Sequence, residues 1–427
     1  MKNKLQKIVR SELVVNSAKL LSANVIAQGI GLIVYPILTR IYSPEDFGLL
    51  NLFLSIGGVL VLFATAEYQY AIVLPKEEEK AQALVHVCGT LLLIVTGVVV
   101  LSVPFSKPIA NLFNTPELAK WYWMMPLFVF TMGAWNILNY WYIRQQQFGA
   151  ISKYQLSQSG LSAAVKMGCG SLHWTAGGLI IGSVFAPILS LIINICRHWK
   201  HTVRDAYAPM RKVCYYEEAR KYRKFPMYSF PRALINTFGG NLPALILTPF
   251  FGLSELGFFG MAMTLAFRPL NMISASLYQT FFQRIAKRVN NRQLIMPFFR
   301  RFLSHALLVI IPTFLLIYFI LPWLTEWLLG TGWSQTGKFI RVMLPWLAVL
   351  TVSASIGFMS DIFQKQHIAA IVEVVCLVLR TASLWAGIHL NDFYTAIALY
   401  SIVGTIIQTG LIIWYMHLAR QHDEQVR

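Results

Sequence analysis

The chain has 427 residues, of which 56% are hydrophobic and only 13% charged, and its formal net charge is +18. Soluble globular proteins have about a quarter of their residues charged, so this composition excludes a protein built mainly of soluble domains. The positive charge could suggest nucleic acid, but no nucleic-acid-binding module is present, so we expect no nucleic-acid partner.

Apolar stretches recur along the whole chain, and each is long enough for a membrane-crossing helix, which needs roughly 20 mostly apolar residues. The fifth of these stretches is the most polar. The sequence therefore predicts an all-α, polytopic membrane protein with about 12 transmembrane helices. We expect the spans near 17–39, 47–71, 83–105, 121–143, 153–173, 177–197, 228–250, 253–283, 302–322, 338–360, 368–389 and 393–417.

Lys and Arg residues indicate the orientation of these spans, because short cytoplasmic loops retain positive charge. With the N-terminus inside, nine of them fall in one inner segment between residues 197 and 224, whereas all the outer loops together hold four. Both termini are therefore expected in the cytoplasm. We interpret the basic segment as a lipid-facing linker that sets topology, and a substrate-gathering role is the alternative.

The basic segment also divides the spans into two sets of six. The predicted domains are an N-terminal six-helix bundle (1–199), a basic cytoplasmic linker (200–226) and a C-terminal six-helix bundle (227–427). A short echo supports this repeat, because Glu45 to Leu50 follows the first span and Ser254 to Phe259 follows the seventh. Parallel repeats of this kind occur in several transporter folds, so we expect a central cavity between the bundles.

Ionisable side chains inside the spans are costly, and they usually face a cavity or a partner. Here the bases exceed the acids, and this surplus suits an anionic ligand such as phosphate, which matches Arg through paired hydrogen bonds. The intramembrane bases are Lys166, Arg232, Arg268, Arg341 and Arg380, and the acids are Glu67 and Glu373.

Helical spacing places polar side chains on one face of several spans. Snorkelling is the alternative for Arg232, and interhelical hydrogen bonding is the alternative for the Asn and Gln residues. Glu67 and Glu373 are candidates for cation coupling, although Glu373 could instead form a structural ion pair with Arg380. The candidate substrate-binding residues are Arg268, Arg232, Lys166, Asn24, Gln28, Asn236 and Asn271.

Several motifs of enzymes and cofactor proteins are missing from the sequence. It contains no GxxxxGK[ST] phosphate loop, no HExxH or GxSxG motif, and no CxxC pair among its five cysteines. We therefore expect a protein that is not an enzyme and that has no cofactor and no metal site.

One family shares short motifs with this chain. The segment Asn24 to Phe53, NVIAQGIGLIVYPILTRIYSPEDFGLLNLF, resembles the opening of bacterial O-antigen and capsule flippases, the Wzx-type polysaccharide transporters. Arg144 to Phe148 and the block from Arg223 to Pro231 are also similar to this family. The Wzx-type family belongs to the multidrug/oligosaccharidyl-lipid/polysaccharide exporter superfamily, whose members place two six-helix bundles around a central cavity.

The resemblance implies a multi-pass protein of the bacterial inner membrane that moves an undecaprenyl-pyrophosphate-linked oligosaccharide to the periplasmic leaflet. It also implies alternating access driven by proton or sodium flux, and basic cavity residues that hold the pyrophosphate. Arg232 and Arg268 match these positions, with Lys166 as a third. The first two spans lack a mid-membrane Arg, so most of the basic residues that would bind the pyrophosphate lie in the second half of the chain.

Membrane lipids, a polysaccharide polymerase and glycosyltransferases are the further partners that the resemblance implies. The glycan and the pathway (O-antigen of lipopolysaccharide, capsule or exopolysaccharide) stay open. The main alternative is a proton- or sodium-coupled multidrug exporter of the same superfamily. A membrane-embedded polymerase or glycosyltransferase and a membrane scaffold are more distant alternatives.

Overall fold

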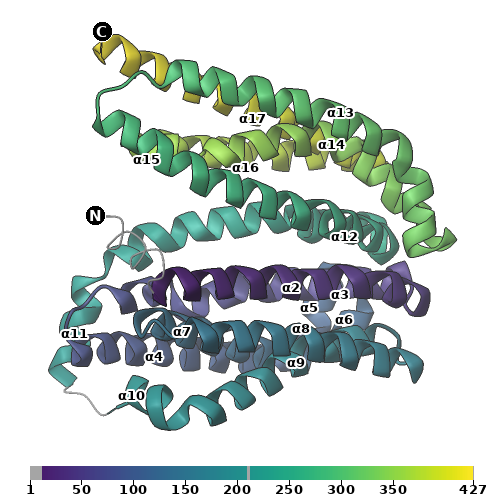
Figure 1. The fold of residues 1–427 in the computed structure, drawn as a ribbon. Coiled ribbons are helices and arrows are strands. Elements are labelled where there is room, and N and C mark those ends of the chain that lie inside the picture. The colour runs from purple at the N-terminus through teal and green to yellow at the C-terminus, as the bar shows by residue number, and fades with distance from the viewer. Residues whose placement is uncertain (1–11, 209–211, 427) are drawn as a thin grey trace. The chain divides into compact units, whose positions relative to one another are not determined.

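The computed structural model describes residues 12–208 and 212–426, without the side chains of 12–21, 23, 24, 200, 201, 212 and 213 (Figure 1). Every regular element in these ranges is a helix, and no strand occurs among them. The all-α prediction is confirmed. The chain forms two compact units, Met1–Ser254 and Glu255–Arg427. The predicted bundle boundary at residue 227 lies earlier than this division, and it stays a prediction.

Unit 1 contains the first six long helices and the start of the seventh. Short 3-10 helices (η1–η3), short α-helices and π-helical turns (η4, η5) join them. Its elements are α2 (Glu12–Ile41), α3 (Pro44–Thr65), η1 (Tyr68–Val73), α4 (Glu78–Ser102), η2 (Val103–Phe105), α5 (Ser106–Leu112), α6 (Pro116–Trp121), η3 (Tyr122–Met124), α7 (Met125–Arg144), α8 (Phe148–Ser171), α9 (Thr175–His198), η4 (Trp199–Val203), α10 (Arg204–Ala206), α11 (Lys212–Lys221), η5 (Phe225–Ser229) and α12 (Phe230–Asn290), whose later part lies in unit 2.

Unit 2 continues from α12 with four long helices. One residue, Gly252, interrupts α12 with φ 81° and ψ −177°, a conformation that only glycine adopts without strain. This break separates the stretches expected as the seventh and eighth spans. The other elements are α13 (Met296–Leu329), η6 (Thr331–Trp333), α14 (Ser334–Ile356), α15 (Met359–Ile362), α16 (Gln366–His389) and α17 (Phe393–Val426).

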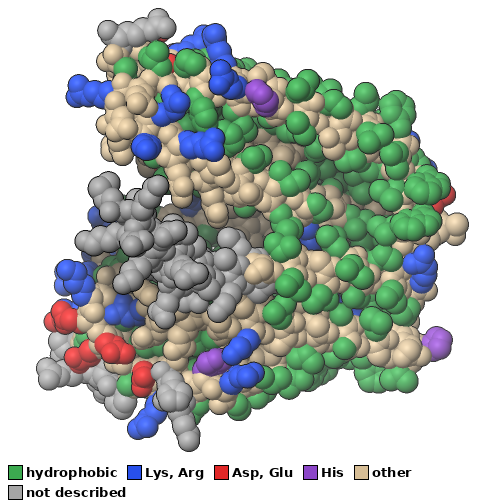
Figure 2. All heavy atoms as spheres, in the orientation of Figure 1, with side chains coloured by type: hydrophobic (Ala, Val, Ile, Leu, Met, Phe, Trp, Pro, Cys, Tyr) green, Lys and Arg blue, Asp and Glu red, His purple; other side chains and the backbone are tan. Residues whose placement is uncertain are grey.

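Eight helical stretches among the described residues are long and apolar enough to cross a membrane. One of them, Cys214–Asn290, includes the break at Gly252, and the shorter helix Val25–Ile41 is also apolar. The faces of these helices carry exposed apolar side chains (Figure 2). On α13, for example, Leu308 and Phe319 are 73% and 68% exposed. A multi-pass membrane protein is therefore supported, and the count of 12 stays a prediction.

The second predicted span, 47–71, is too long at its C-terminal end. Helix α3 stops at Thr65 because Ala66 and Glu67 both adopt the left-handed conformation, with φ values of 43° and 66°. The N–H group of Ala66 still bonds to the carbonyl of Leu62 at 3.0 Å, which closes the last turn. Apolar residues continue into η1, so hydropathy alone does not mark this end.

Aromatic side chains fill the interior of unit 1 where α7, α8 and α9 meet. The rings of Trp135 and Tyr154 stack with centroids 3.4 Å apart. Beside them, the buried Tyr142 hydroxyl donates to Asn194 Oδ1 at 2.7 Å. Asn194 Nδ2 in turn donates to the carbonyl of Ala150 at 2.9 Å, so this polar group is bonded on both sides.

The described part of the basic linker is mostly helical, and its helices α10 and α11 pack against α4 within unit 1. Gln82 Nε2 on α4 donates to the carbonyl of Asp205 at 2.9 Å. The hydroxyl of Tyr68 donates to the carbonyl of Ala219 on α11, also at 2.9 Å. Arg220 nevertheless stays exposed. Arg220 is therefore exposed on a helix that these contacts hold, and the topology-setting role of the linker stays a prediction.

Candidate functional site

Lys166 lies in unit 1 where α8 packs between α2 and α9. Its side chain is half-buried, and a Cβ placed on Gly182 of α9 would lie 2.5 Å from Lys166 Cγ. The aliphatic stem therefore covers this glycine. The Lys166 carbonyl accepts a 2.7 Å hydrogen bond from the Tyr42 hydroxyl, which ties α8 to the end of α2. The surroundings of Lys166 are thus defined by helix packing.

Helix α2, which holds Asn24 and Gln28, packs against α8. Asn24 lies in α2, but its side chain is outside the described part, so its predicted role stays a prediction. Gln28 is half-buried one residue after Ala27, whose carbonyl accepts a 2.7 Å hydrogen bond from Ser159 of α8. Ser159 therefore joins α8 to α2 by an interhelical hydrogen bond.

Arg232 and Asn236 are both exposed on the first part of α12. This part runs beside α3, because the Phe230 ring lies 4.9 Å from that of Phe63 and a Cβ on Gly48 would lie 1.9 Å from the Leu253 carbonyl oxygen.

Arg268 and Asn271 lie in unit 2, on the second part of α12. Arg268 is half-buried and Asn271 is exposed. The neighbouring Phe267 ring contacts Trp346 of α14, with centroids 5.4 Å apart. The predicted substrate-binding residues thus fall into a set in unit 1 and a set in unit 2, and the central cavity that would unite them stays a prediction.

Glu67 lies beyond the end of α3, and it is only 6% exposed. Burial raises the pKa of its carboxyl above the usual range, and a hydrogen bond with Gln69 opposes this shift. Near it, the rings of Tyr70 and Tyr140 pack edge to face, 4.8 Å apart. A buried carboxyl that favours its protonated form is a suitable proton carrier, so the geometry is compatible with the predicted coupling role.

The other coupling candidate, Glu373, is half-buried on α16 of unit 2. Arg380, its predicted ion-pair partner, contacts two aromatic rings, those of Trp346 and Tyr400. The coupling role of Glu373 stays a prediction.

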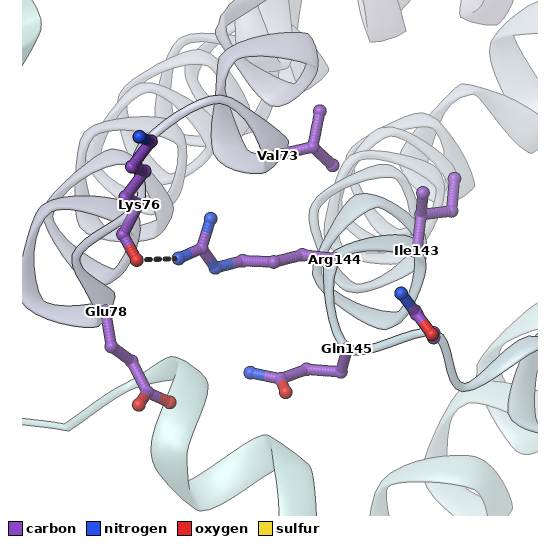
Figure 3. A pocket seen from close by; sticks show the side chains of 7 residues that line it. Val73, Lys76, Glu78, Ile143, Arg144 and Gln145 are labelled. Atoms are coloured by element: carbon purple, nitrogen blue, oxygen red, sulfur yellow. Dashed lines mark hydrogen bonds between the residues drawn. The ribbon is translucent and has the colours of Figure 1, made fainter.

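A polar pocket of about 480 Å³ lies where α7 ends and α4 begins (Figure 3). Its most basic group, Arg144, donates from Nη1 to the carbonyls of Ile72 at 3.3 Å and Pro75 at 2.5 Å. Its Nη2 donates to the carbonyls of Lys76 at 3.3 Å and Glu77 at 3.4 Å. Through these bonds Arg144, at the end of α7, stabilises the turn between η1 and α4. The pocket is lined by Val73, Lys76, Glu78, Ile143, Arg144, Gln145 and Gln146.

In the sequence, Arg144 stands out only as part of the family resemblance, and nothing there reveals this contact. An Arg at the end of a span was the available signal, but the carbonyls that it binds lie about 70 residues earlier, so spacing along the chain does not reveal them. Among the described residues, no group of three or more His, Cys, Asp or Glu side chains could hold a metal ion.

The sequence matches a known protein family over most of its length. Residues 37–338 match the family described as "Polysaccharide biosynthesis protein". The chain belongs to this family. A curated relative, the succinoglycan biosynthesis transport protein ExoT of Rhizobium meliloti (strain 1021), is 23% identical over 274 residues, which are 63% of this chain and 53% of ExoT. The chain therefore matches about half the length of that relative.

Two solved structures establish the fold of this polysaccharide biosynthesis protein. The lipid II flippase MurJ, in an inward closed conformation, has a TM-score of 0.73 at 14% identity, covering 97% of this chain and 90% of MurJ. An inward-facing multidrug resistance MATE transporter of the MOP superfamily has a TM-score of 0.69 at 12% identity, covering 97% of this chain and 99% of the transporter. The chain thus shares its fold with this lipid II flippase and with this MATE transporter.

Proposed function

We propose that this protein flips an undecaprenyl-pyrophosphate-linked oligosaccharide from the cytoplasmic to the periplasmic leaflet of the bacterial inner membrane, for O-antigen, capsule or exopolysaccharide synthesis. The observation that carries this proposal is the family match over residues 37–338. The likeness in fold to a lipid II flippase and the relation to a succinoglycan transport protein support it further.

The charges inside the helices favour an anionic cargo. A pyrophosphate and bulky sugars need a wet, cationic path, while a polyprenyl tail can stay in lipid. Arg268 is our first candidate for gripping the pyrophosphate, because it is half-buried within a helix and can bind two phosphate oxygens at once. Arg232, Asn236 and Asn271 would add exposed polar contacts.

Gln28 and Lys166 are the further candidates in unit 1. Lys166 would act as a point charge on a flexible stem, which binds phosphate without the paired geometry of Arg. Asn24 completes the proposed set. Glu67 would carry the coupling ion, with Glu373 as the second choice, and binding of a proton there would accompany the change between inward- and outward-open states.

A multidrug exporter is the second candidate function, because MATE transporters share the fold. Transport of cationic drugs would favour acidic residues along the path, whereas the predicted spans contain five basic and only two acidic residues. This surplus favours the lipid-linked oligosaccharide, and a drug-sensitivity screen would detect the alternative.

The test is to delete the gene and measure lipid-linked oligosaccharides in each leaflet, by mass spectrometry and with a glycan-modifying enzyme confined to the periplasm. We expect complete repeat units that resist modification to accumulate, and the wild-type gene to reverse this. Arg268→Ala should fail to do so, whereas Arg284→Ala, an exposed arginine on the same helix, should succeed. Normal periplasmic access in the deletion strain would refute flipping, and rescue by Arg268→Ala would refute the role of Arg268.

A further inference from the structure

The pocket at the end of α7 combines charges of both signs. Lys76 and Glu78 both line it, and neither forms an ion pair with another residue that the structure describes. Their neighbours Glu77 and Lys80, in contrast, pair with each other at 2.6 Å. Lys76 and Glu78 are also exposed, so the pocket offers an ammonium group and a carboxylate to a ligand from outside the protein.

Arg144 contributes a second positive charge to the pocket wall. Its Nη1 and Nη2 atoms donate to the backbone carbonyls of Ile72, Pro75, Lys76 and Glu77. These acceptors are neutral, and within the described part of the chain the guanidinium has no carboxylate partner. Arg144 therefore supplies a charge in a fixed position, whereas the Lys76 ammonium is carried on a flexible stem.

The groups of the pocket are sorted by type (Figure 3). Val73, Ile143 and the Lys76 side chain lie on one side of the Arg144 guanidinium, and Glu78 lies on the other. The pocket therefore has an apolar and basic side and an acidic side, with the guanidinium between them.

The two sides also differ in their expected depth in the membrane. Ile143 ends the predicted span 121–143, whereas Glu78 precedes the predicted span 83–105 by five residues. Five helical residues correspond to about 8 Å, which is similar to the headgroup layer of roughly 5–8 Å on each side of the hydrocarbon core. Next to Val73, Leu74 is 54% exposed and extends the apolar side. We therefore expect the pocket at the level of the lipid headgroups, with its apolar side toward the acyl chains.

A phospholipid headgroup that ends in a primary amine matches this arrangement. Its phosphate is attracted by Lys76 and Arg144, and its ammonium donates hydrogen bonds that the Glu78 carboxylate accepts. A glycerol headgroup would bring no cation to Glu78, and the methylated ammonium of choline has no N–H group to donate. The pocket volume of about 480 Å³ is within the range of roughly 300–1,000 Å³ that small-molecule sites occupy.

We propose that this pocket binds the headgroup of phosphatidylethanolamine, with its phosphate at Lys76 and Arg144 and its ammonium at Glu78. The lipid joins the start of α4 to the end of α7, two helices that pack together in unit 1, and it stabilises this unit. The site uses none of the residues proposed for the flipped substrate, so it does not depend on the proposed function.

The test uses purified, delipidated full-length protein in a mild detergent. Its thermal unfolding is followed while phosphatidylethanolamine, phosphatidylglycerol or phosphatidylcholine with the same acyl chains is added. A ligand that binds only the folded state raises the melting temperature as its concentration increases. We expect a saturable rise that reaches half its maximum at the lowest mole fraction for phosphatidylethanolamine. Native mass spectrometry of the same samples, which counts bound lipids, should give the same order.

A soluble headgroup separates a lipid from a free metabolite. Glycerophosphoethanolamine at the same concentrations should leave the melting temperature unchanged, because it lacks the acyl chains that the apolar side would contact. A rise equal to that of the lipid would assign the pocket to a soluble ligand and overturn the proposal.

Two variants test the charges separately. Glu78→Gln removes the acceptor of the ammonium, so phosphatidylethanolamine should lose its advantage over phosphatidylglycerol. Lys76→Ala should weaken the apparent affinity for both lipids about two- to fivefold, as expected for a partly exposed ion pair. Without lipid, both variants should melt like the wild type, because neither side chain has an ion-pair partner among the described residues.

Glu77→Gln and Lys80→Ala are the matched controls. They remove the same charges from the same turn, but these two side chains pair with each other and do not line the pocket. Both variants should keep the preference for phosphatidylethanolamine. An equal response of the wild type to all three lipids, or a wild-type response in both Glu78→Gln and Lys76→Ala, would overturn the proposal.

Discussion

Gly48→Ala is a sharp test of the packing in unit 1, because the added methyl group meets backbone. A Cβ at Gly48 would lie 1.9 Å from the Leu253 carbonyl oxygen, and real Cβ contacts are essentially never shorter than 3.0 Å. The two backbones would have to part by at least 1.1 Å, the difference between these distances. Nearby, the 3.0 Å hydrogen bond from Ser254 Oγ to Glu45 Oε1 would also be disturbed.

Gly58 provides the matched control on the same helix, since a Cβ there meets nothing within 4 Å. Both substitutions raise the helix propensity by the same amount, about 1 kcal/mol. The difference in stability between the two variants therefore reports the steric clash at Gly48. Overpacking of this kind costs about 1–3 kcal/mol. For a unit of this size we expect Gly48→Ala to melt about 2–12 °C below Gly58→Ala. Thermal unfolding of the purified variants, followed by tryptophan fluorescence, measures this, and equal melting temperatures would refute the reasoning.

Three further variants test single contacts. Arg144→Ala should lower the free energy of unfolding by about 2–4 kcal/mol, because charge-assisted bonds to backbone carbonyls are lost. Asp423→Ala should cost about 1–2 kcal/mol, because its carboxylate accepts the backbone N–H bonds of Ile295 and Met296 at 2.8 and 3.0 Å at the start of α13. Glu67→Gln should stabilise the protein at pH 7 but not near pH 4.5, the ordinary carboxyl pKa. Since the folded pKa is raised, the wild type is most stable with Glu67 protonated and loses stability as pH rises through that pKa.

Denaturation monitored by circular dichroism suits the first two of these variants, and melting temperature against pH suits the third. Lys76→Ala should be nearly neutral, because Arg144 contacts the Lys76 carbonyl and not its side chain. Asp423→Asn, which keeps one acceptor oxygen, should cost less than Asp423→Ala. Parallel pH profiles for wild type and Glu67→Gln would show that the burial of this carboxyl does not favour its protonated form.

Hydropathy located the long helices closely, because apolar side chains and bilayer thickness limit where a span can lie. The predicted span 177–197 corresponds to α9 (Thr175–His198), and 368–389 corresponds to α16 (Gln366–His389). Helix ends were less predictable. The apolar run after Thr65 gave no sign that Ala66 and Glu67 would turn left-handed and end α3.

The surroundings of the candidate residues depend on helices that are distant in sequence. Ser159 lies in the fifth predicted span, which the sequence marks as the most polar, but only the packed structure reveals that the Ala27 carbonyl accepts its hydrogen bond. An ion pair with Glu373 was one of two interpretations left open for Arg380, and the structure places its guanidinium against the rings of Trp346 and Tyr400 on two other helices. Such contacts leave no signal in the spacing of a single sequence.

The docked linker bears on the order in which the protein is made. Its contacts join Tyr68 to Ala219 and Gln82 to Asp205, so both partners have left the ribosome once residue 219 has emerged. At 5–20 residues per second, synthesis of unit 2 then takes on the order of 10–30 s more. Unit 1 can therefore assemble in the membrane before most of unit 2 exists, and a defect in the linker contacts would act during biosynthesis, ahead of any step of transport.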